Sequence, residues 1–315
     1  MSKFAFIFPG QGSQFIGMGK DLADNFGAAK AVFEEVDAAL GQDLSGLMWS
    51  GAEDELKLTA NTQPALMAVS VAAMRAFEEA HGIGADKAAF IAGHSLGEYS
   101  ALASAGAISV GDCAKVLRIR GNAMQDAVPA GEGAMAALLG ASPEQAAALC
   151  AAGASEGPCE IANDNAPGQI VISGAKAAVE LAISGAKEAG VKKAVLLPVS
   201  APFHCSLMQP AADAMSEALS KIEIKAPAAP LVANVTATAG NDPEAIRNQL
   251  VEQVTGQVRW TESVQFMAAE GVVLTIEAGA GKVLSVMNRR TVRALEGLTM
   301  GSPEEINAVA ERLNA

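Results

Sequence analysis

Short apolar runs alternate with longer segments of helical periodicity along most of this 315-residue chain, and this alternation limits the folds that it can adopt. The runs Phe4–Phe8 and Ala88–Gly93 have the length and composition of buried strands. Helical periodicity is found over about Lys20–Leu40, Pro64–His81, Gly97–Ser104 and Ser109–Val128. Strands separated by helices are typical of a parallel sheet with helices on both faces. The sequence therefore predicts an α/β fold.

A second pattern follows Val128. Strands are predicted at Gly133–Leu139, Glu160–Asn163, Ile170–Ser173 and Ala194–Val199, and helices at Ser142–Ala152 and Ala175–Ala189. The letters Asn-Asp-Asn-Ala-Pro-Gly between the second and third strands are a strong turn signal. The order strand-helix-strand-strand-helix-strand is that of a ferredoxin-like unit. We expect an inserted ferredoxin-like small domain at 128–200, within a large α/β catalytic domain formed by 1–127 and 201–315.

Composition and charge exclude several kinds of protein. Half of the residues are hydrophobic and 18% are charged, so a sizeable core is available. The balance of 22 basic and 35 acidic residues gives a net charge of −13, which argues against nucleic acid or an anionic membrane as a partner. No stretch approaches the roughly 20 apolar residues of a membrane helix, and the N-terminal segment lacks the features of a signal peptide.

The four cysteines point to a reducing compartment. Cys113, Cys150, Cys159 and Cys205 form no C-x-x-C pair and have no spacing to histidine that suits zinc. We therefore expect reduced thiols, no metal site and a cytoplasmic protein.

Residues 93–97, Gly-His-Ser-Leu-Gly, match the G-x-S-x-G pattern of a nucleophile elbow. An apolar strand runs into this motif and a helical segment follows it, which is the setting that an elbow requires. The glycines allow a sharp turn, and the amino terminus of the helix directs N–H groups at developing negative charge. We expect Ser95 to be a nucleophile. The alternative is an ordinary turn in which Ser95 only caps the helix.

A serine nucleophile needs a base, and the chain has three histidines. His81 ends a helix, and His94 adjoins Ser95 on a turn, where neighbouring side chains usually diverge. His204 follows a strand at the end where open parallel sheets hold active sites, so it is the favoured base. Cys205 is poorly placed to act as nucleophile with the adjacent His204. No acid stands out as a third member, so we expect a Ser–His dyad whose tautomer a main-chain carbonyl could fix.

The oxyanion of an acyl transfer needs two N–H donors. Leu96 directly follows the nucleophile and supplies one. Gln11, in the loop Gly10-Gln11-Gly12 after the first strand, is the natural second source. A dinucleotide-binding loop is the competing interpretation, but Phe15 stands where G-x-G-x-x-G requires glycine.

Arg120 lies on an unexpected face of its predicted helix. At about 100° per residue it falls within the apolar stripe, whereas Arg118 lies to one side. A buried guanidinium needs an anion, because an unpaired buried charge costs several kcal/mol. The anion is either an internal Asp or Glu, or a substrate carboxylate held in bidentate fashion.

Four motifs in this order resemble the malonyl-CoA:acyl carrier protein transacylase family. They are Phe-Pro-Gly-Gln-Gly-Ser-Gln at 8–14, Gly-His-Ser-Leu-Gly-Glu at 93–98, Arg-x-Arg-Gly-x-x-Met at 118–124 and Pro-Val-Ser-Ala-Pro-Phe-His at 198–204. The resemblance implies a hydrolase-like α/β core that carries a ferredoxin-like insert.

The resemblance also assigns roles to residues. Ser95 would be acylated, His204 would be its base, and Arg120 would bind the malonyl carboxylate. Gln11 and Leu96 would form the oxyanion hole, and the main-chain carbonyl of Gln253 would orient the imidazole. Further pocket positions are His94, Asn163, Asn165 and Phe203. An aromatic ring at Phe203 goes with malonyl rather than methylmalonyl selection.

The implied reaction is a two-step transfer of malonyl from malonyl-CoA to the phosphopantetheine thiol of acyl carrier protein, in fatty acid biosynthesis. CoA thioester is a substrate, and no bound cofactor is expected. The acidic carrier needs a local basic patch, for which the candidates are Lys187, Lys192, Lys193, Arg289, Arg290 and Arg293. The alternatives are a serine thioesterase or hydrolase on the same dyad, and a non-catalytic carrier-binding module.

Overall fold

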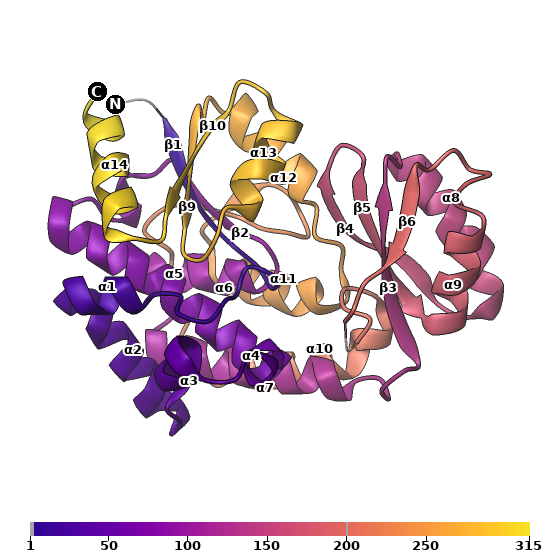
Figure 1. Cartoon of the computed structure of the whole chain (residues 1–315), viewed down its shortest axis with the longest axis horizontal. Helices are drawn as coiled ribbons and strands as arrows, with labels where there is room; N and C mark the ends of the chain where they lie inside the picture. Colours follow the sequence, from indigo (N-terminus) through magenta and orange to yellow (C-terminus); the bar gives the residue numbers. More distant parts are fainter. Residues whose placement is uncertain (1–2, 200) are drawn as a thin grey trace.

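The computed structural model describes residues 3–199 and 201–315, and within them the strands form two sheets (Figure 1). The larger sheet has the order β10-β9-β1-β2-β7-β8. All its neighbouring strands pair in parallel except β7 and β8. Its strands are β1 Phe4–Phe8, β2 Phe90–Gly93, β7 Leu231–Val232, β8 Ala239–Gly240, β9 Leu274–Ala278 and β10 Glu296–Met300. The predicted α/β class is therefore confirmed.

Helices cover both faces of this sheet, which explains why β1 is apolar at every position. Phe4, Phe6 and Phe8 face one core, whereas Ala5 and Ile7 face another. Successive strand residues point to opposite faces, so a strand buried on both sides needs a continuous apolar run. The helices of this part are α1 Lys20–Asn25, α2 Gly27–Leu40, α3 Leu44–Ser50, α4 Glu53–Lys57, α5 Thr59–His81, α6 Leu96–Ser104, α7 Val110–Asp126, α10 Gln209–Ser220, α11 Pro243–Thr255, α12 Trp260–Ala269, α13 Val283–Thr291 and α14 Pro303–Asn314.

Two predicted helices differ from the observed ones. The single helix expected over 20–40 is divided, because Phe26 has an extended backbone with φ −130° between α1 and α2. The helix expected to begin at Pro64 begins at Thr59, so that Pro64 lies inside α5. Nearly every α5 residue from Thr59 to Phe77 is buried, and this packing offsets the hydrogen bond that proline cannot donate.

The second sheet has the order β4-β5-β3-β6, and all its pairs are antiparallel. It lies to one side of the larger sheet, and α8 and α9 pack on one of its faces (Figure 1). The predicted elements occur in the predicted order, although α9 ends five residues early. They are β3 Gly133–Leu139, α8 Pro143–Gly153, β4 Cys159–Ala166, β5 Gln169–Ala175, α9 Lys176–Ser184 and β6 Lys193–Leu196.

The turn expected over residues 163–168 is shorter than predicted, because β4 continues to Ala166, three residues beyond its predicted end at Asn163. Only Pro167 and Gly168 separate β4 from β5. Strand β4 has two register shifts in this region, and Asp164 N–H donates to the carbonyl of Val258, at an N···O distance of 3.0 Å. A distant backbone segment thus supplies the partner that keeps this polar stretch extended.

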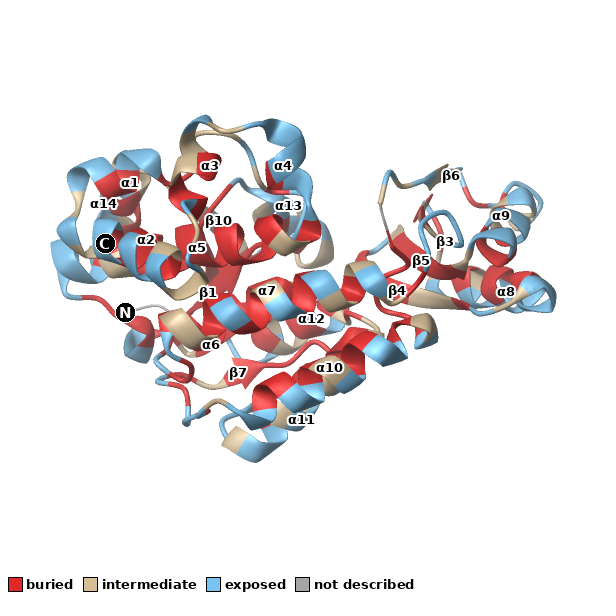
Figure 2. Cartoon of the chain, turned by 90° about the horizontal axis from the view of Figure 1, so that it is seen from below, coloured by how far each residue is buried: buried red, intermediate tan, exposed pale blue. Residues whose placement is uncertain are grey.

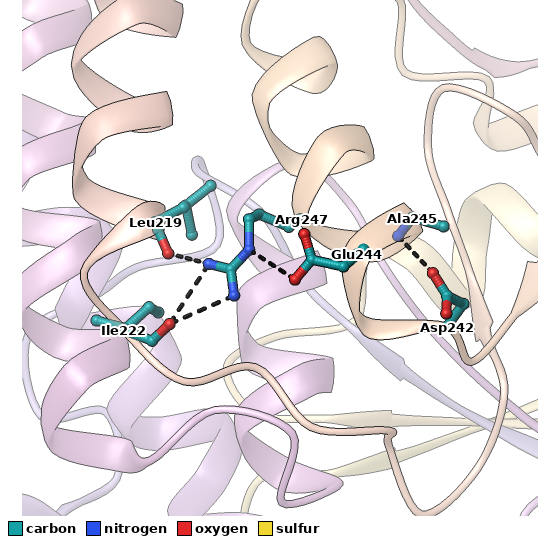
Figure 3. A network of polar contacts seen from close by, with 6 residues as sticks. All are labelled: Leu219, Ile222, Asp242, Glu244, Ala245 and Arg247. Atoms are coloured by element: carbon teal, nitrogen blue, oxygen red, sulfur yellow. Dashed lines mark hydrogen bonds and ion pairs between the residues drawn. The ribbon is translucent and has the colours of Figure 1, made fainter.

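Helices α10 and α11 pack together, each with buried residues along one side and exposed residues along the other (Figure 2). Arg247 of α11 ties them further, since its guanidinium donates to the carbonyls of Leu219 and Ile222 at the end of α10 (Figure 3). Carbonyls at a helix end otherwise lack partners. None of the helices within 3–199 and 201–315 has the length and apolarity needed to cross a membrane.

Arg247→Met should lower the free energy of unfolding by about 1–2 kcal/mol, because two main-chain carbonyls lose a charged donor while the aliphatic stem is kept. Arg75→Met is the matched control, because each arginine pairs with a glutamate three residues away in its own helix. Arg75 pairs with Glu78, and Arg247 pairs with Glu244. An exposed pair of this kind contributes less than about 0.5 kcal/mol. Urea denaturation of both variants measures the difference, and equal effects would contradict a role for the carbonyl contacts.

Candidate active site

Ser95 stands at a sharp bend between β2 and α6, the strand–turn–helix form that the sequence predicts. Its backbone has φ 53° and ψ −111°, in a region that non-glycine residues rarely occupy. A Cβ at Gly93 would lie 2.0 Å from the Gly97 carbonyl, and one at Gly97 would lie 2.2 Å from the Phe8 carbonyl oxygen. Both flanking positions therefore require glycine for close backbone approach.

His204 lies beside this serine, although 109 residues separate the two in the chain. Its Nε2 is 2.8 Å from Ser95 Oγ, and its Nδ1 is 2.9 Å from the Gln253 carbonyl oxygen and 3.1 Å from that of Gly256. A carbonyl can only accept, so Nδ1 carries the proton and Nε2 is left as acceptor for the serine hydroxyl.

Burial holds His204 in the neutral form. The side chain is buried, and this burial, together with the positive charge of Arg120, lowers the pKa of His204 from its usual 6.5 to about 3. The two carbonyl contacts oppose the shift only in part. An imidazole that is unprotonated at neutral pH and hydrogen-bonded to a hydroxyl can act as its general base.

Arg120 is buried in α7, as its position in the apolar stripe predicts, and is 1% exposed. Its guanidinium donates to Ser95 Oγ at 3.1 Å and to the side-chain oxygens of Gln63 and Gln253, each at 2.9 Å. It also lies over the ring of Tyr99, with Cζ 5.5 Å from the ring centre. These partners are neutral, and none of the ion pairs in the described part of the chain includes Arg120. The internal carboxylate partner considered from the sequence is thus absent among the described residues.

A cavity of about 160 Å³ opens beside these groups. The sequence-predicted residues in its wall are Gln11, His94, Ser95, Leu96, Arg120, Asn163, Phe203 and His204. Gln253 and Asn165 do not line the cavity but contact residues that do. Gln253 bonds Arg120 through its side chain and His204 through its main-chain carbonyl, and Asn165 Oδ1 is 2.7 Å from His94 Nε2. The ten predicted site residues, which come from distant parts of the sequence, are therefore gathered at one place.

The other histidine and cysteine candidates lie as expected. His81 is exposed and contacts Asn307. Cys205 is buried and contacts the Pro202 carbonyl, and burial raises the pKa of its thiol to about 11. All four cysteines are free and buried. Within residues 3–199 and 201–315, no cluster of three His, Cys, Asp or Glu side chains is arranged to hold a metal ion.

Sequence reasoning missed three polar residues of the site. Gln63 of α5 accepts a hydrogen bond from Arg120. The side chain of Asn234 contacts both sides of the elbow, since it accepts from Ser95 N–H at 2.8 Å and donates to the Gly93 carbonyl at 2.7 Å. Glu98, part of the elbow motif, is fully buried in α6. A single charged residue inside a helix that is otherwise uncharged was the one available signal.

Comparison with known proteins gives one consistent result. Residues 5–306 match the acyl transferase domain family. The malonyl CoA-acyl carrier protein transacylase of Bacillus subtilis (strain 168) is 48% identical over 314 residues, which cover 99% of this chain and 98% of the relative.

Solved structures agree with this relative. The crystal structure of the acyl-carrier-protein-S-malonyltransferase from Bartonella henselae is 54% identical, covers 99% of this chain and 100% of its own, and gives a TM-score of 0.97. A malonyl-transacylase solved in complex with its type II polyketide acyl-carrier protein is 42% identical, with a TM-score of 0.95 over 99% of this chain and all of that one. The chain therefore belongs to the acyl transferase family. Within this family it is a member of the malonyl-CoA:acyl carrier protein transacylases, as its four motifs predict.

Proposed function

We propose that the chain transfers the malonyl group from malonyl-CoA to the phosphopantetheine thiol of acyl carrier protein, in fatty acid biosynthesis, through a malonyl ester on Ser95. One observation carries this proposal: Ser95 Oγ lies 2.8 Å from a neutral imidazole and 3.1 Å from a buried guanidinium that forms no ion pair with a carboxylate among the described residues. The imidazole can activate the hydroxyl, and the guanidinium can bind a substrate carboxylate.

In the first step, Ser95 Oγ attacks the thioester carbonyl while His204 Nε2 takes the hydroxyl proton. The main-chain N–H groups of Leu96 and Gln11 stabilise the oxyanion that forms. The C–S bond then breaks, and the departing CoA sulfur receives the proton from Nε2. In the second step, the carrier thiol gives its proton to Nε2 and attacks the ester carbonyl. The C–O bond breaks, and the proton returns to Ser95 Oγ.

Arg120 accounts for the choice of acyl group. In malonyl thioesters the free carboxylate lies two carbons from the reacting carbonyl, so a cation beside the nucleophile can hold it while the carbonyl reacts. The cavity of about 160 Å³ suits a small acyl group, and Phe203 lies in its wall, where the resemblance associates an aromatic ring with malonyl rather than methylmalonyl. Malonyl is thus the substrate that both the charge and the size of the site favour.

We assign the chain a hydrolase-like core, residues 1–127 and 201–315, with an inserted ferredoxin-like domain at 128–200. The elbow between β2 and α6 supports the first part. The strand order β4-β5-β3-β6 and the two helices on one face support the second, since strands two and three are adjacent and one and four complete the sheet. A cytoplasmic location remains a prediction from the sequence.

The carrier would bind at the cationic patch that the sequence suggests. Lys187, Lys192 and Lys193 lie on the insert, Arg289, Arg290 and Arg293 lie at and just after the end of α13, and all six side chains are exposed. Arg290 donates to Gln169 at the start of β5, at 3.0 Å, so the arginines contact the insert that carries the lysines. The complex of a related transacylase with its carrier supports this kind of partner, and the acidic charge that carriers of this family have suits the patch.

Incubation with malonyl-CoA should add the mass of one malonyl group to the protein, and Ser95→Ala should stay unmodified, because the Ser95 hydroxyl lies 2.8 Å from the neutral imidazole of His204. Intact-mass spectrometry after a rapid acid quench measures both. Addition of the carrier should then remove the malonyl group and place it on the phosphopantetheine. Release as free malonate instead would indicate a hydrolase, and no adduct on the wild type would indicate a non-catalytic binding module.

Arg120→Ala should lower kcat/KM for malonyl-CoA by about two orders of magnitude and leave acetyl-CoA much less affected, because only malonyl has a carboxylate to lose. Arg118→Ala is the control, since Arg118 lies in the same helix but donates to Gln42. Acylation rates with the two thioesters give the selectivity of each variant. An unchanged malonyl-to-acetyl ratio in Arg120→Ala would exclude this role.

The acylation rate should change less than about twofold between pH 8 and pH 5. Because the pKa of His204 is lowered to about 3, the base stays neutral throughout this range. A histidine with the usual pKa of about 6.5 would lose roughly thirtyfold of its neutral form by pH 5. Single-turnover acylation by malonyl-CoA gives the profile, and a decline centred near pH 6.5 would show that His204 titrates normally.

A further inference from the structure

Glu98 is a buried acid to which the proposed reaction assigns no step. It lies in the first turn of α6, three residues after the nucleophile, with no exposed surface. Its Oε2 accepts from the side-chain amide of Gln253 at 2.9 Å and from the main-chain N–H of Asn234 at 3.0 Å. Its Oε1 has no hydrogen-bond partner among the described residues. One oxygen thus makes both contacts, and each contacted residue in turn bonds a residue of the proposed reaction, Arg120 or Ser95.

The first contact leads to Arg120. The amide of Gln253 donates through Nε2 to Glu98 and to the Ser95 carbonyl, the latter at 3.0 Å, and accepts through Oε1 from Arg120. An amide turned by 180° would present its NH₂ group to the guanidinium, so that two donors would face each other. Glu98 Oε2 only accepts, and therefore favours the orientation that gives Arg120 an oxygen.

The second contact leads to the elbow. Glu98 fixes the main chain of Asn234, whose side chain bonds both Ser95 N–H and the Gly93 carbonyl. Ser95 has a backbone conformation that is costly for a residue with a side chain, and such a conformation persists only where its surroundings hold it. Asn234 is one such support, and Glu98 anchors it.

We propose that Glu98 is a positioning residue, which through one carboxylate oxygen aligns Arg120 by way of Gln253 and the Ser95 backbone by way of Asn234. This inference rests on the proposed malonyl transfer. It differs from a purely structural role in one respect. Loss of the carboxylate should weaken acylation by all thioesters through the elbow, and weaken malonyl further through the arginine.

The contacts require an acceptor rather than a charge. Burial raises the pKa of Glu98 to about 7, although its two hydrogen bonds and Arg120 oppose the shift. A proton on the unpartnered Oε1 leaves both bonds at Oε2 in place. A glutamine with its oxygen in the position of Oε2 would keep the same two bonds, whereas leucine of similar size would keep neither.

The test compares Glu98→Gln with Glu98→Leu by the rates at which malonyl-CoA and acetyl-CoA acylate Ser95. We expect Glu98→Gln to stay within about threefold of the wild type for both, with an unchanged malonyl-to-acetyl ratio. Glu98→Leu should slow both reactions and lower the ratio about tenfold. Ser100→Ala is the matched control, because Ser100 is equally buried in α6 and its hydroxyl has no partner among the described residues. It should change neither rate.

A double-mutant cycle identifies the route to Arg120. In a Gln253→Leu background, which keeps the carbonyl that binds His204, Glu98→Leu should cause no further fall in the ratio. Equal slowing of both thioesters by Glu98→Leu, or a Glu98→Gln variant as impaired as Glu98→Leu, would overturn the inference. If Glu98→Leu does not fold, Glu98→Gln must keep the ratio and Gln253→Leu must lower it, or the inference fails. A wild type that takes up no malonyl would instead refute the proposed function.

Discussion

The site is built around a guanidinium that is 1% exposed and, among the described residues, has no carboxylate partner. Removing such a charge from water costs several kcal/mol unless other groups replace the solvent. Two amide oxygens, one hydroxyl and the face of Tyr99 do so for Arg120. They accept hydrogen bonds from its two NH₂ groups without neutralising its charge, while its Nε has no partner among the described residues. The site therefore retains an attraction for an anion of a size that the cavity admits.

The same charge affects the base. Arg120 is the second contribution, after burial, to the lowered pKa of His204. In the proposed reaction, selection of an acidic acyl group and retention of a neutral imidazole would therefore have a common source. Gln253 links the two groups, since its side chain contacts Arg120 and its main chain contacts His204. Helix α11 carries Gln253, and Arg247 in the same helix fixes α11 to the end of α10, which begins five residues after His204.

Local patterns predicted those parts of the structure whose causes are local. The elbow was predictable because the motif at 93–97 directly follows its strand in the sequence. The burial of Arg120 was predictable because, at helical spacing, a charged residue within an apolar stripe is easily recognised. Strand β1 was predictable because burial on both faces requires an unbroken apolar run. The sequence missed the extended form of residues 164–166, since the Val258 carbonyl that pairs with Asp164 lies more than ninety residues away.

Other features of the site and the fold cannot be recognised from the types of the residues that form them. The carbonyl of Gln253 that binds His204 is a main-chain group, which any residue supplies, so only the resemblance to a family indicated it. Gln63 and Asn234 are common polar residues whose importance comes from what they contact in three dimensions. The break at Phe26 and the early start of α5 likewise depend on packing across helices rather than on local propensity.

Strand β4 extends this dependence to the smaller sheet, because three of its side chains contact segments outside that sheet, two of them next to Ser95 or His204. Glu160 accepts from Ser206, two residues after His204, Asn165 contacts His94 beside Ser95, and Asp164 Oδ1 accepts from Thr261 at 2.7 Å. The position of the smaller sheet and the geometry of the Ser95–His204 pair are therefore linked. Both Ser95 and His204 have positive φ, at 53° and 59°, so each needs its surroundings to hold it. By bonding the residue beside Ser95 and the segment after His204, β4 supports both strained positions from the far side of the cavity.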